Sequence, residues 1–274
     1  MTRPSIGVFD SGVGGLSVLR EIQQKLPNES LLYFADQRHV PYGSRSLDDV
    51  QALSEGITRF LLEQGCKLVV VACNTASAAA LYTLRSSFPA VPFVGMEPAI
   101  KPAAERSETR KVAVLATPAT FQGALFDSVV ERFARGVEVI EIIAPGLVEL
   151  VEAGQTASEA VDAVLLASLE PAKSREIDTL VLACTHYSFV IPTIRRILGP
   201  SVSVIDPAPA IASQTDKLWG RQIDVVSTQP GTSIRYITSG DPNTFRASLF
   251  KLIGDEVNAQ AASWEAGSLI LHGN

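Results

Sequence analysis

The sequence predicts an α/β protein of two pseudo-symmetric lobes, each a mostly parallel sheet flanked by helices. Short apolar runs rich in β-branched residues alternate along the chain with segments whose apolar residues recur at helical spacing. One of these runs occurs twice, since residues 68–75 and residues 179–186 both reach an Ala-Cys pair and precede a helix-like segment. The two copies match at an offset of 111 residues, which places Cys73 on Cys184. Self-similarity over about thirty residues indicates a duplicated structural unit.

The same offset predicts where the chain passes between the lobes. It places Pro98 on Pro209, and prolines interrupt regular structure. Pro98 and Pro102 are therefore expected to mark the outward crossover, and residues 206–209 the return. The expected domains are a first lobe of residues 1–98 completed by residues 208–274, and a second lobe of residues 99–207.

In the first lobe, an apolar strand is expected at residues 5–9, ahead of a glycine-rich turn. After this turn Leu16, Leu19 and Ile22 recur at helical spacing. Glycines let the backbone approach a ligand and a helix start offers N–H groups, so the turn is interpreted first as a small-anion site and second as a packing turn. The other elements expected here are strands at 31–35, at the first repeated run and at 91–94, with helices at 47–64 and from the repeated run to about residue 85.

A polar loop at residues 36–46 separates the second strand from the next helix. Its Pro41-Tyr42-Gly43-Ser44 run has two interpretations, a turn initiated by proline or a loop that presents backbone N–H groups and two hydroxyls. The loop residues alone do not decide between them.

The second lobe repeats the alternation. Its expected strands are 111–115, 137–143, the second repeated run and 202–205, and its expected helices run from the turn at 116–120 to about 135, through Glu149 and Glu152, and over 157–170. The C-terminal stretch is expected to add helices at 210–219 and 243–253 and a strand at 233–238. The last dozen residues fit a short strand or a loose tail equally well.

Composition narrows the class of protein. With 274 residues, 46% of them hydrophobic and 19% charged, the chain can bury two cores. A net charge of −6 offers no basic footprint for nucleic acid or a membrane surface, and no apolar run reaches the length of a membrane span. Three cysteines without a C-x-x-C spacing are typical of a reducing compartment, so a cytoplasmic location is expected.

Candidate site residues gather at the expected carboxyl ends of strands, where parallel sheets bind ligands. Asp10, Cys73, Thr117 and Cys184 all occupy such positions, so one cleft between facing lobes is expected to collect them. A lone free cysteine is usually a small buried hydrophobe, and Cys66 is interpreted in that way.

Cys73 and Cys184 differ because each ends a strand, precedes a helix start that is expected to lower its thiol pKa, and has an equivalent in the other lobe. Two opposed acid-base groups suit stereoinversion at a carbon, since one removes a proton and the other returns a proton to the opposite face. His186 and Asp10 are candidates to hold or shuttle these protons. Suitable donors to a substrate carboxylate are Ser11, Asn74, Thr75 and Thr185.

Four motifs in order resemble those of the cofactor-independent glutamate racemases. They are Phe9-Asp10-Ser11-Gly12-Val13-Gly14-Gly15-Leu16, Val40-Pro41-Tyr42-Gly43, Ala72-Cys73-Asn74-Thr75-Ala76-Ser77 and Cys184-Thr185-His186-Tyr187. The resemblance runs from residue 6 to about residue 253 and includes Leu150-Val151-Glu152. The sequence departs from the family pattern at Ala116, Ala183 and Ser188.

The resemblance implies two α/β lobes with the active site between them, and a role in supplying D-glutamate for bacterial peptidoglycan. It implies that Cys73 and Cys184 are the two bases and that Asp10, Glu152 and His186 assist them. The residues that it implies for holding the amino acid are Ser11, Tyr42, Gly43, Asn74, Thr75, Thr117, Thr120 and Thr185.

Three alternatives stay open at this point. An aspartate racemase would share the scaffold. Relatives of that type resemble this chain but usually carry an acidic residue at the position of His186. A zinc enzyme could use Cys73, Cys184 and His186 as ligands, although the usual ligand spacings are absent. A binding protein without catalysis would leave the duplicated thiols unexplained.

Neither a lysine in the paired motifs nor a nucleotide fingerprint is present, so no cofactor is expected, neither pyridoxal phosphate nor flavin nor metal. The expected partner is a small amino-acid substrate, and the sequence leaves a homodimer open.

Overall fold

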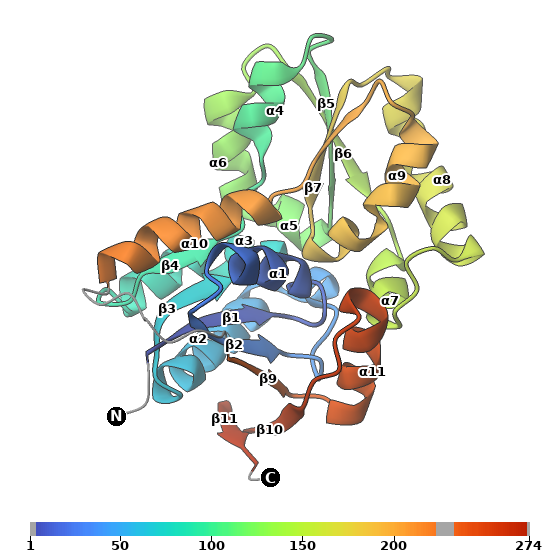
Figure 1. Cartoon of the computed structure of the whole chain (residues 1–274). Helices are drawn as coiled ribbons and strands as arrows, with labels where there is room; N and C mark the ends of the chain where they lie inside the picture. The colour runs from blue at the N-terminus through green and yellow to red at the C-terminus, as the bar shows by residue number, and fades with distance from the viewer. Residues whose placement is uncertain (1–3, 223–232, 273–274) are drawn as a thin grey trace.

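The computed structural model describes residues 4–222 and 233–272, and it contains two sheets (Figure 1). The first sheet has seven strands in the order β11-β10-β9-β2-β1-β3-β4, and the second has four in the order β6-β5-β7-β8. The strands of the first sheet are β1 (Ser5–Asp10), β2 (Ser30–Ala35), β3 (Cys66–Val71), β4 (Phe93–Gly95), β9 (Ile234–Thr238), β10 (Ala259–Glu265) and β11 (Ser268–Leu271). Those of the second are β5 (Lys111–Ala116), β6 (Glu138–Ile143), β7 (Thr179–Ala183) and β8 (Ser203–Ile205).

All pairs of neighbouring strands are parallel except β10 and β11, which form an antiparallel hairpin. The helices of the first lobe are α1 (Leu16–Lys25), α2 (Leu47–Glu63), α3 (Asn74–Ser87), α10 (Ala208–Gln222) and α11 (Pro242–Ile253), with the short 3₁₀ helix η1 (Tyr42–Ser44). Those of the second are α4 (Ile100–Arg106), α5 (Pro118–Gln122), α6 (Ala124–Phe133), α7 (Leu147–Glu152), α8 (Glu159–Ser174) and α9 (Ile191–Leu198), with the 3₁₀ helix η2 (Thr185–Val190). The predicted α/β class with two lobes is confirmed.

The first sheet is covered on both faces, as its alternating side chains show. Val8 of β1 belongs to the apolar cluster that includes Leu16 of α1 and Trp219 of α10. Its neighbour Phe9 belongs to a different cluster, with Phe60 of α2 and Leu84 of α3. Because successive residues of a strand point to opposite faces, each face of this sheet carries its own helices and core.

Three predicted segments differ from the structure. The predicted outward crossover contains α4, in which Pro102 lies in the first turn, where its missing N–H costs no helical hydrogen bond. The helix predicted from the turn at 116–120 to about residue 135 is divided at Gly123 into α5 and α6. The second repeated run leads into η2 before α9 begins, whereas α3 starts directly after the first.

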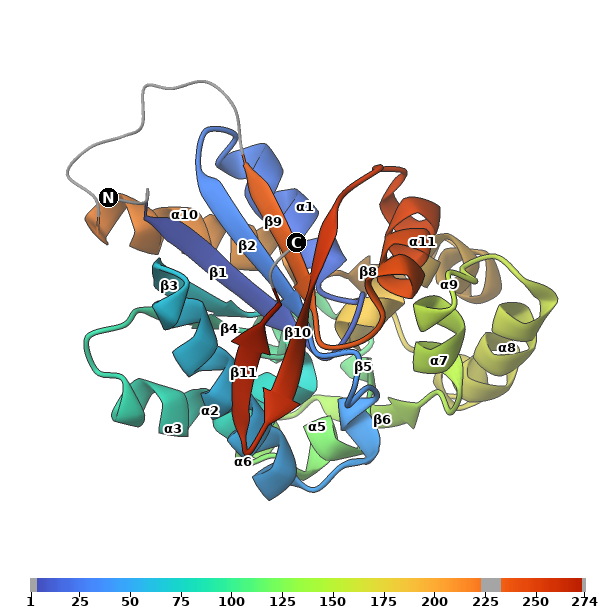
Figure 2. The ribbon, with the colours of Figure 1, turned by 90° about the horizontal axis from the view of Figure 1, so that it is seen from below.

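The last residues form the hairpin of β10 and β11 rather than a tail (Figure 2). Strand β10 pairs with β9, and β11 packs near α2. The C-terminal segment therefore completes the first sheet. Strands of that sheet come from residues 5–95 and 234–271, and those of the second from residues 111–205. Domain boundaries at 98/99 and 207/208 stay a prediction.

Among residues 4–222 and 233–272, no helix combines the length and the apolar character needed to cross a membrane.

Candidate active site

The two equivalent cysteines line one small cavity between the lobes. Cys73 follows β3 and Cys184 follows β7, and their side chains are 5% and 6% exposed. The cavity has a volume of about 20 Å³ and is lined by Ser11, Pro41, Tyr42, Gly43, Cys73, Asn74, Thr75, Thr117, Val148, Cys184, Thr185 and His186. Since that volume accommodates about one water molecule, the cavity in this structure is too small to hold an amino acid.

Cys73 caps the helix that follows it. Its sulfur accepts a hydrogen bond from the Ala76 N–H at 3.5 Å, at the first turn of α3. Burial raises the pKa of the Cys73 thiol well above its usual value, and the nearby Asp10 carboxyl and the second thiol, Cys184, raise it further. The Ala76 N–H at the helix start does lower this pKa, but desolvation outweighs that single donor, so the expected net lowering is wrong for Cys73.

Cys184 has a different partner. Its sulfur lies 3.8 Å from Nδ1 of His186, whose Nε2 lies 2.6 Å from Oε1 of Glu152. Burial alone lowers the pKa of His186, but the contacts with Cys184 and Glu152 raise it well above its usual value. An imidazolium held by a carboxylate therefore faces the Cys184 sulfur.

Glu152 joins the lobes through the glycine-rich turn. Its Oε1 accepts the Val13 N–H at 2.8 Å, and its Oε2 accepts Nε2 of Gln37 at 3.1 Å. A Cβ at Gly12 would overlap the Glu152 carboxylate, and one at Gly14 would overlap the His186 ring. The glycines are thus needed for close packing against the second lobe. The N–H groups of Ser11, Val13 and Gly15 bind the protein's own carboxylates, which favours the packing interpretation of the turn over a small-anion site.

Asp10 occupies the corresponding position beside Cys73. Its carboxylate is fully buried and accepts the Ser11 N–H at 2.8 Å, the Gly15 N–H at 2.6 Å and the Thr185 hydroxyl at 3.4 Å. Burial raises the pKa of Asp10, although the charge of His186 and the donors around it act in the opposite direction. A carboxyl with a raised pKa next to a thiol is suited to holding a proton.

Hydroxyl groups from both lobes meet at the cavity wall. Thr75 lies 2.9 Å from Thr117 between hydroxyl oxygens, and Thr117 lies 2.9 Å from Thr120. Beside them, the buried Asn74 amide has neither its oxygen nor its nitrogen paired. Because buried polar atoms are nearly always hydrogen-bonded, an unpaired amide at the cavity wall indicates a position for a polar ligand group.

The Tyr42 hydroxyl is engaged within the protein. It donates to Oδ2 of Asp36 at 2.7 Å, and burial together with that carboxylate raises its pKa well above the usual value. Of the Tyr42-Gly43 pair, the backbone is the part left to face a ligand. A Cβ at Gly43 would lie 2.6 Å from the Thr117 side chain, so glycine lets the two lobes approach here.

The structure brings the predicted site residues together. Those that line the cavity are Ser11, Tyr42, Gly43, Cys73, Asn74, Thr75, Thr117, Cys184, Thr185 and His186, and those that contact the lining residues are Asp10, Glu152 and Thr120. Sequence reasoning missed Gln37, Val148 and Asp36. Asp36 alone had a signal, because it directly follows the predicted strand at 31–35.

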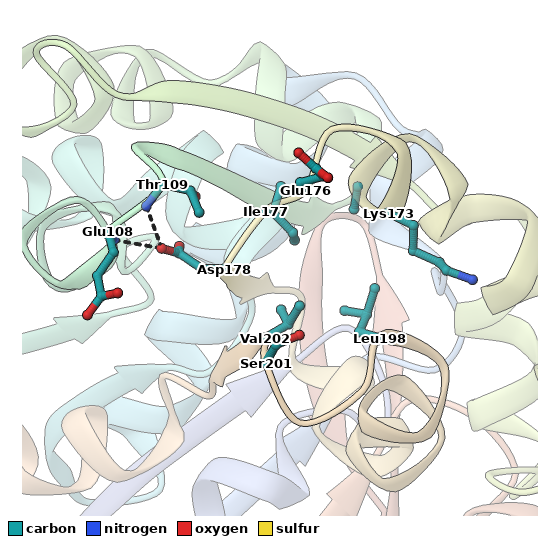
Figure 3. A pocket seen from close by; sticks show the side chains of 10 residues that line it. Glu108, Thr109, Lys173, Glu176, Ile177, Asp178, Leu198, Ser201 and Val202 are labelled. Atoms are coloured by element: carbon teal, nitrogen blue, oxygen red, sulfur yellow. Dashed lines mark hydrogen bonds between the residues drawn. The ribbon is translucent and has the colours of Figure 1, made fainter.

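A larger cavity, of about 470 Å³, lies at the opposite end of the second sheet (Figure 3). Asp178 lies on its wall and accepts the N–H groups of Glu108 and Thr109 at 2.6 and 2.8 Å. These residues precede β5 and β7, so the cavity lies at the amino ends of parallel strands, away from the edge where such sheets bind substrates.

The zinc alternative has no support in the part of the chain that the structure describes. There, no three side chains of His, Cys, Asp or Glu are arranged to hold a metal ion. Cys73, Cys184 and His186 share a cavity without forming such a set.

The Glu152–His186 pair makes stability depend on pH in a defined window. The pKa of Glu152 is lowered, since the contacts with His186, Val13 and Gln37 outweigh its burial. Its contribution is present above the unfolded pKa of 4.5 and is lost as pH falls through the lower folded pKa. His186, whose folded pKa is raised, contributes fully below 6.5 and loses this contribution as pH rises through that folded value.

We therefore expect Glu152→Gln to lower the free energy of unfolding by about 3 kcal/mol near pH 5.5, because it leaves the buried imidazolium of His186 without its carboxylate partner. The loss should shrink as pH rises. Urea unfolding of wild-type protein and the variant across this range measures it, and a difference that grows with pH would contradict the assignment.

Comparisons with known proteins cover both lobes. The sequence matches the model of the Asp/Glu/hydantoin racemase family over residues 6–215. It is 49% identical over 251 residues to a glutamate racemase of Ectopseudomonas mendocina, and the aligned region covers 92% of this chain and 95% of that protein.

Two solved structures are similar over nearly the whole chain. A glutamate racemase isoform from Bacillus anthracis aligns with a TM-score of 0.87 at 29% identity, covering 98% of this chain and 100% of that one. The Escherichia coli glutamate racemase in complex with L-glutamate and the activator UDP-MurNAc-ala aligns with a TM-score of 0.83 at 30% identity, covering 99% and 100%.

Proposed function

The chain belongs to the Asp/Glu/hydantoin racemase family, and on this premise we propose that it interconverts L- and D-glutamate by a two-cysteine acid/base mechanism without a cofactor. The observation that carries the mechanism is the pair of equivalent thiols, Cys73 and Cys184, on one cavity between the lobes. Each thiol has its own ionisable partner, Asp10 on one side and His186 with Glu152 on the other.

The proposed reaction moves one proton off Cα and another onto it. The thiolate of one cysteine takes the α-proton, the S–H bond forms, and the electron pair of the broken C–H bond stays on the substrate as a carbanion. The thiol of the other cysteine then gives its proton to the opposite face of Cα. The reverse reaction exchanges the two roles, and proton exchange with solvent restores the starting protonation state.

The partners of the thiols support this cycle. The raised pKa of Cys73 favours its protonated form, the acid needed when Cys184 acts as base. The imidazolium of His186 beside Cys184 supplies positive charge and a proton on that side of the cavity. Asp10, with its raised pKa, holds the proton that Cys73 gives up.

The polar wall of the cavity fits the carboxylates of glutamate. We propose that the free amide of Asn74 binds one polar group of the substrate, because its atoms have no other partner. The hydroxyl groups of Thr75, Thr117 and Thr120 would bind a carboxylate once the lobes open and their mutual hydrogen bonds are released. The remaining proposed contacts are Ser11, Thr185 and the backbone of Tyr42 and Gly43.

Glutamate is favoured over aspartate by the relatives, which at 49% identity include a glutamate racemase. Purified protein should therefore turn over glutamate with a kcat/KM at least about 100-fold above that for aspartate, because the shorter acid cannot reach both sets of carboxylate donors. Polarimetry with each acid tests this, and a higher kcat/KM for aspartate would reject the assignment.

The activity should also withstand exhaustive chelation, because the proposed mechanism uses no metal ion. A loss of activity that added zinc restores would reject the metal-free mechanism.

We further propose that the enzyme works in the cytoplasm and supplies D-glutamate for peptidoglycan synthesis. Depletion of the protein should make growth depend on added D-glutamate, whereas growth that never requires it would contradict this role.

A further inference from the structure

Asp36 is a buried carboxylate that the proposed reaction does not use. It follows the last residue of β2, its side chain is fully buried, and its backbone N–H donates to the Asp10 carbonyl at 3.0 Å. Its two oxygens accept hydrogen bonds from four side chains that come from three separate parts of the sequence. A buried carboxyl group needs such partners, so each hydrogen bond offsets part of the cost of burying it.

The first oxygen is held by the C-terminal part of the chain. Oδ1 accepts the Ser239 hydroxyl at 2.6 Å and the Trp264 indole N–H at 2.8 Å. Ser239 follows β9 and Trp264 belongs to β10, so both donors lie more than 200 residues away in sequence. Asp36 is thus the point where the C-terminal hairpin is tied to the carboxyl end of β2.

The second oxygen is held by the loop that lines the thiol cavity. Oδ2 accepts the Tyr42 hydroxyl at 2.7 Å, and Tyr42 lies on the cavity wall. The next residue, Gly43, approaches Thr117 of the other lobe so closely that a Cβ would not fit. A shift of the Tyr42 ring would therefore move a backbone segment that faces both the cavity and the opposite lobe.

His39 closes the network between its two sides. Its Nδ1 lies 3.0 Å from Oδ2, and since a carboxylate only accepts, Nδ1 is assigned as the protonated nitrogen. The His39 ring also packs edge-on against Trp264, with the ring centroids 5.6 Å apart. Trp264 thus touches the network twice, through its N–H and through its ring.

We propose that Asp36 is a positioning residue for the substrate-binding loop, and that the C-terminal hairpin sets the place of Tyr42 and Gly43 through the Trp264 N–H. This inference rests on the proposed function for its kinetic consequence, but its structural part does not depend on the substrate. Asp36 does not touch the cavity and acts through Tyr42.

The first variant is Trp264→Phe, because it keeps an aromatic ring in the hairpin and removes the N–H that reaches Asp36, together with part of the indole, whose six-membered ring lies beside Gly56. The matched control is Trp219→Phe, since Trp219 is buried in α10 within the core of the first lobe and does not contact the network. Asp36→Asn is the second variant. It replaces one carboxylate oxygen, which accepts hydrogen bonds, by an amide nitrogen, which can only donate, so that nitrogen faces donors it cannot pair with.

Trp264→Phe should raise the KM for glutamate at least about fivefold and change kcat less than about twofold, since a hydrogen bond to a charged group is lost while the thiols stay in place. Asp36→Asn should raise KM further. Amide exchange in residues 37–46, followed by mass spectrometry, should be faster in both variants than in wild-type protein or Trp219→Phe. A role limited to folding would lower thermal stability without this separation of KM from kcat.

The outcomes separate this inference from the proposed function. If wild-type protein racemises glutamate and Trp264→Phe matches Trp219→Phe in KM and in exchange, the positioning role is wrong and the function stands. A fall in kcat at unchanged KM would also overturn the role. If wild-type protein does not act on glutamate, the function fails, and the exchange of residues 37–46 still decides whether Asp36 holds the loop.

Discussion

Cys73→Ala and Cys184→Ala should each lower the rate of glutamate inversion by at least about 10³-fold, because each removes one of the two groups that exchange protons with Cα. Both cysteines lie on the cavity wall rather than at the centre of a sheet, so alanine should leave the fold intact. Circular dichroism and polarimetry on the same samples measure both effects.

The single variants should retain half of the chemistry. A protein with one remaining thiol can still exchange the α-proton of one enantiomer with solvent, although it cannot complete the inversion. Cys73→Ala and Cys184→Ala should therefore exchange the α-proton of opposite enantiomers with solvent. Such exchange would show that each variant is folded and binds substrate. Exchange of the same enantiomer by both variants would contradict their placement on opposite faces.

Cys66→Ala is the matched control. Cys66 is buried at the start of β3, where its sulfur lies 3.4 Å from the Ser5 hydroxyl, outside the cavity. Its removal should cost some stability and leave kcat/KM unchanged. A loss of activity comparable to that of the other two variants would mean that thiol loss acts through folding.

His186→Asn should lower kcat/KM for glutamate by about 100-fold or more, since it removes both the charged partner of Cys184 and the Nε2 that contacts Glu152. The two enantiomers have equal free energies in water, so kcat/KM must fall equally in both directions. The separate kcat values are free to change unequally, because His186 lies beside one thiol only.

The pairing with Glu152 supplies a second measurement on the same residues. If Glu152 acts by holding the imidazolium, His186→Asn combined with Glu152→Gln should cost little more than His186→Asn alone, as expected for residues that work as a unit. Fully additive losses would show that Glu152 has a separate role and would contradict this arrangement.

Local patterns in the sequence predicted most of the fold. The apolar runs that became β1, β2, β5 and β7 are buried throughout the strand or nearly so, and such strands leave a strong signal. The repeat added the pairing of Cys73 with Cys184, which spacing alone could not provide. The division at Gly123 and the 3₁₀ helix after Cys184 depend on tertiary packing, so periodicity did not predict them.

The C-terminal hairpin shows why the rest was harder. Residues of β10 are mostly half-buried, and a run such as Ala259–Glu265 carries little apolar alternation. Its pairing with β9 joins residues such as Ala259 and Tyr236, which are 23 apart in sequence, and the Trp264 N–H reaches Asp36, 228 residues away. Interactions of this range leave no pattern in a local window.

The candidate site was predicted as a set of residues but not as a set of charges. Strand-end positions identified Asp10, Cys73 and Cys184, while the link from Glu152 to His186 and to the Val13 N–H joins elements that only the fold brings together. The predicted sign of the pKa shift at Cys73 was wrong because the shift depends on burial, and burial depends on how the elements around the cavity pack together.

The proton inventory of the first turnovers tests the two-thiol mechanism most directly. Wild-type protein is given one glutamate enantiomer in deuterated water, and the α-carbon of both enantiomers is analysed by mass spectrometry while conversion is low. The mechanism predicts deuterium in the product and protium in the remaining substrate, because the returning proton comes from a thiol that has exchanged with solvent. Equal deuterium in substrate and product from the first turnovers would show a single exchanging base and would contradict the opposed roles of Cys73 and Cys184.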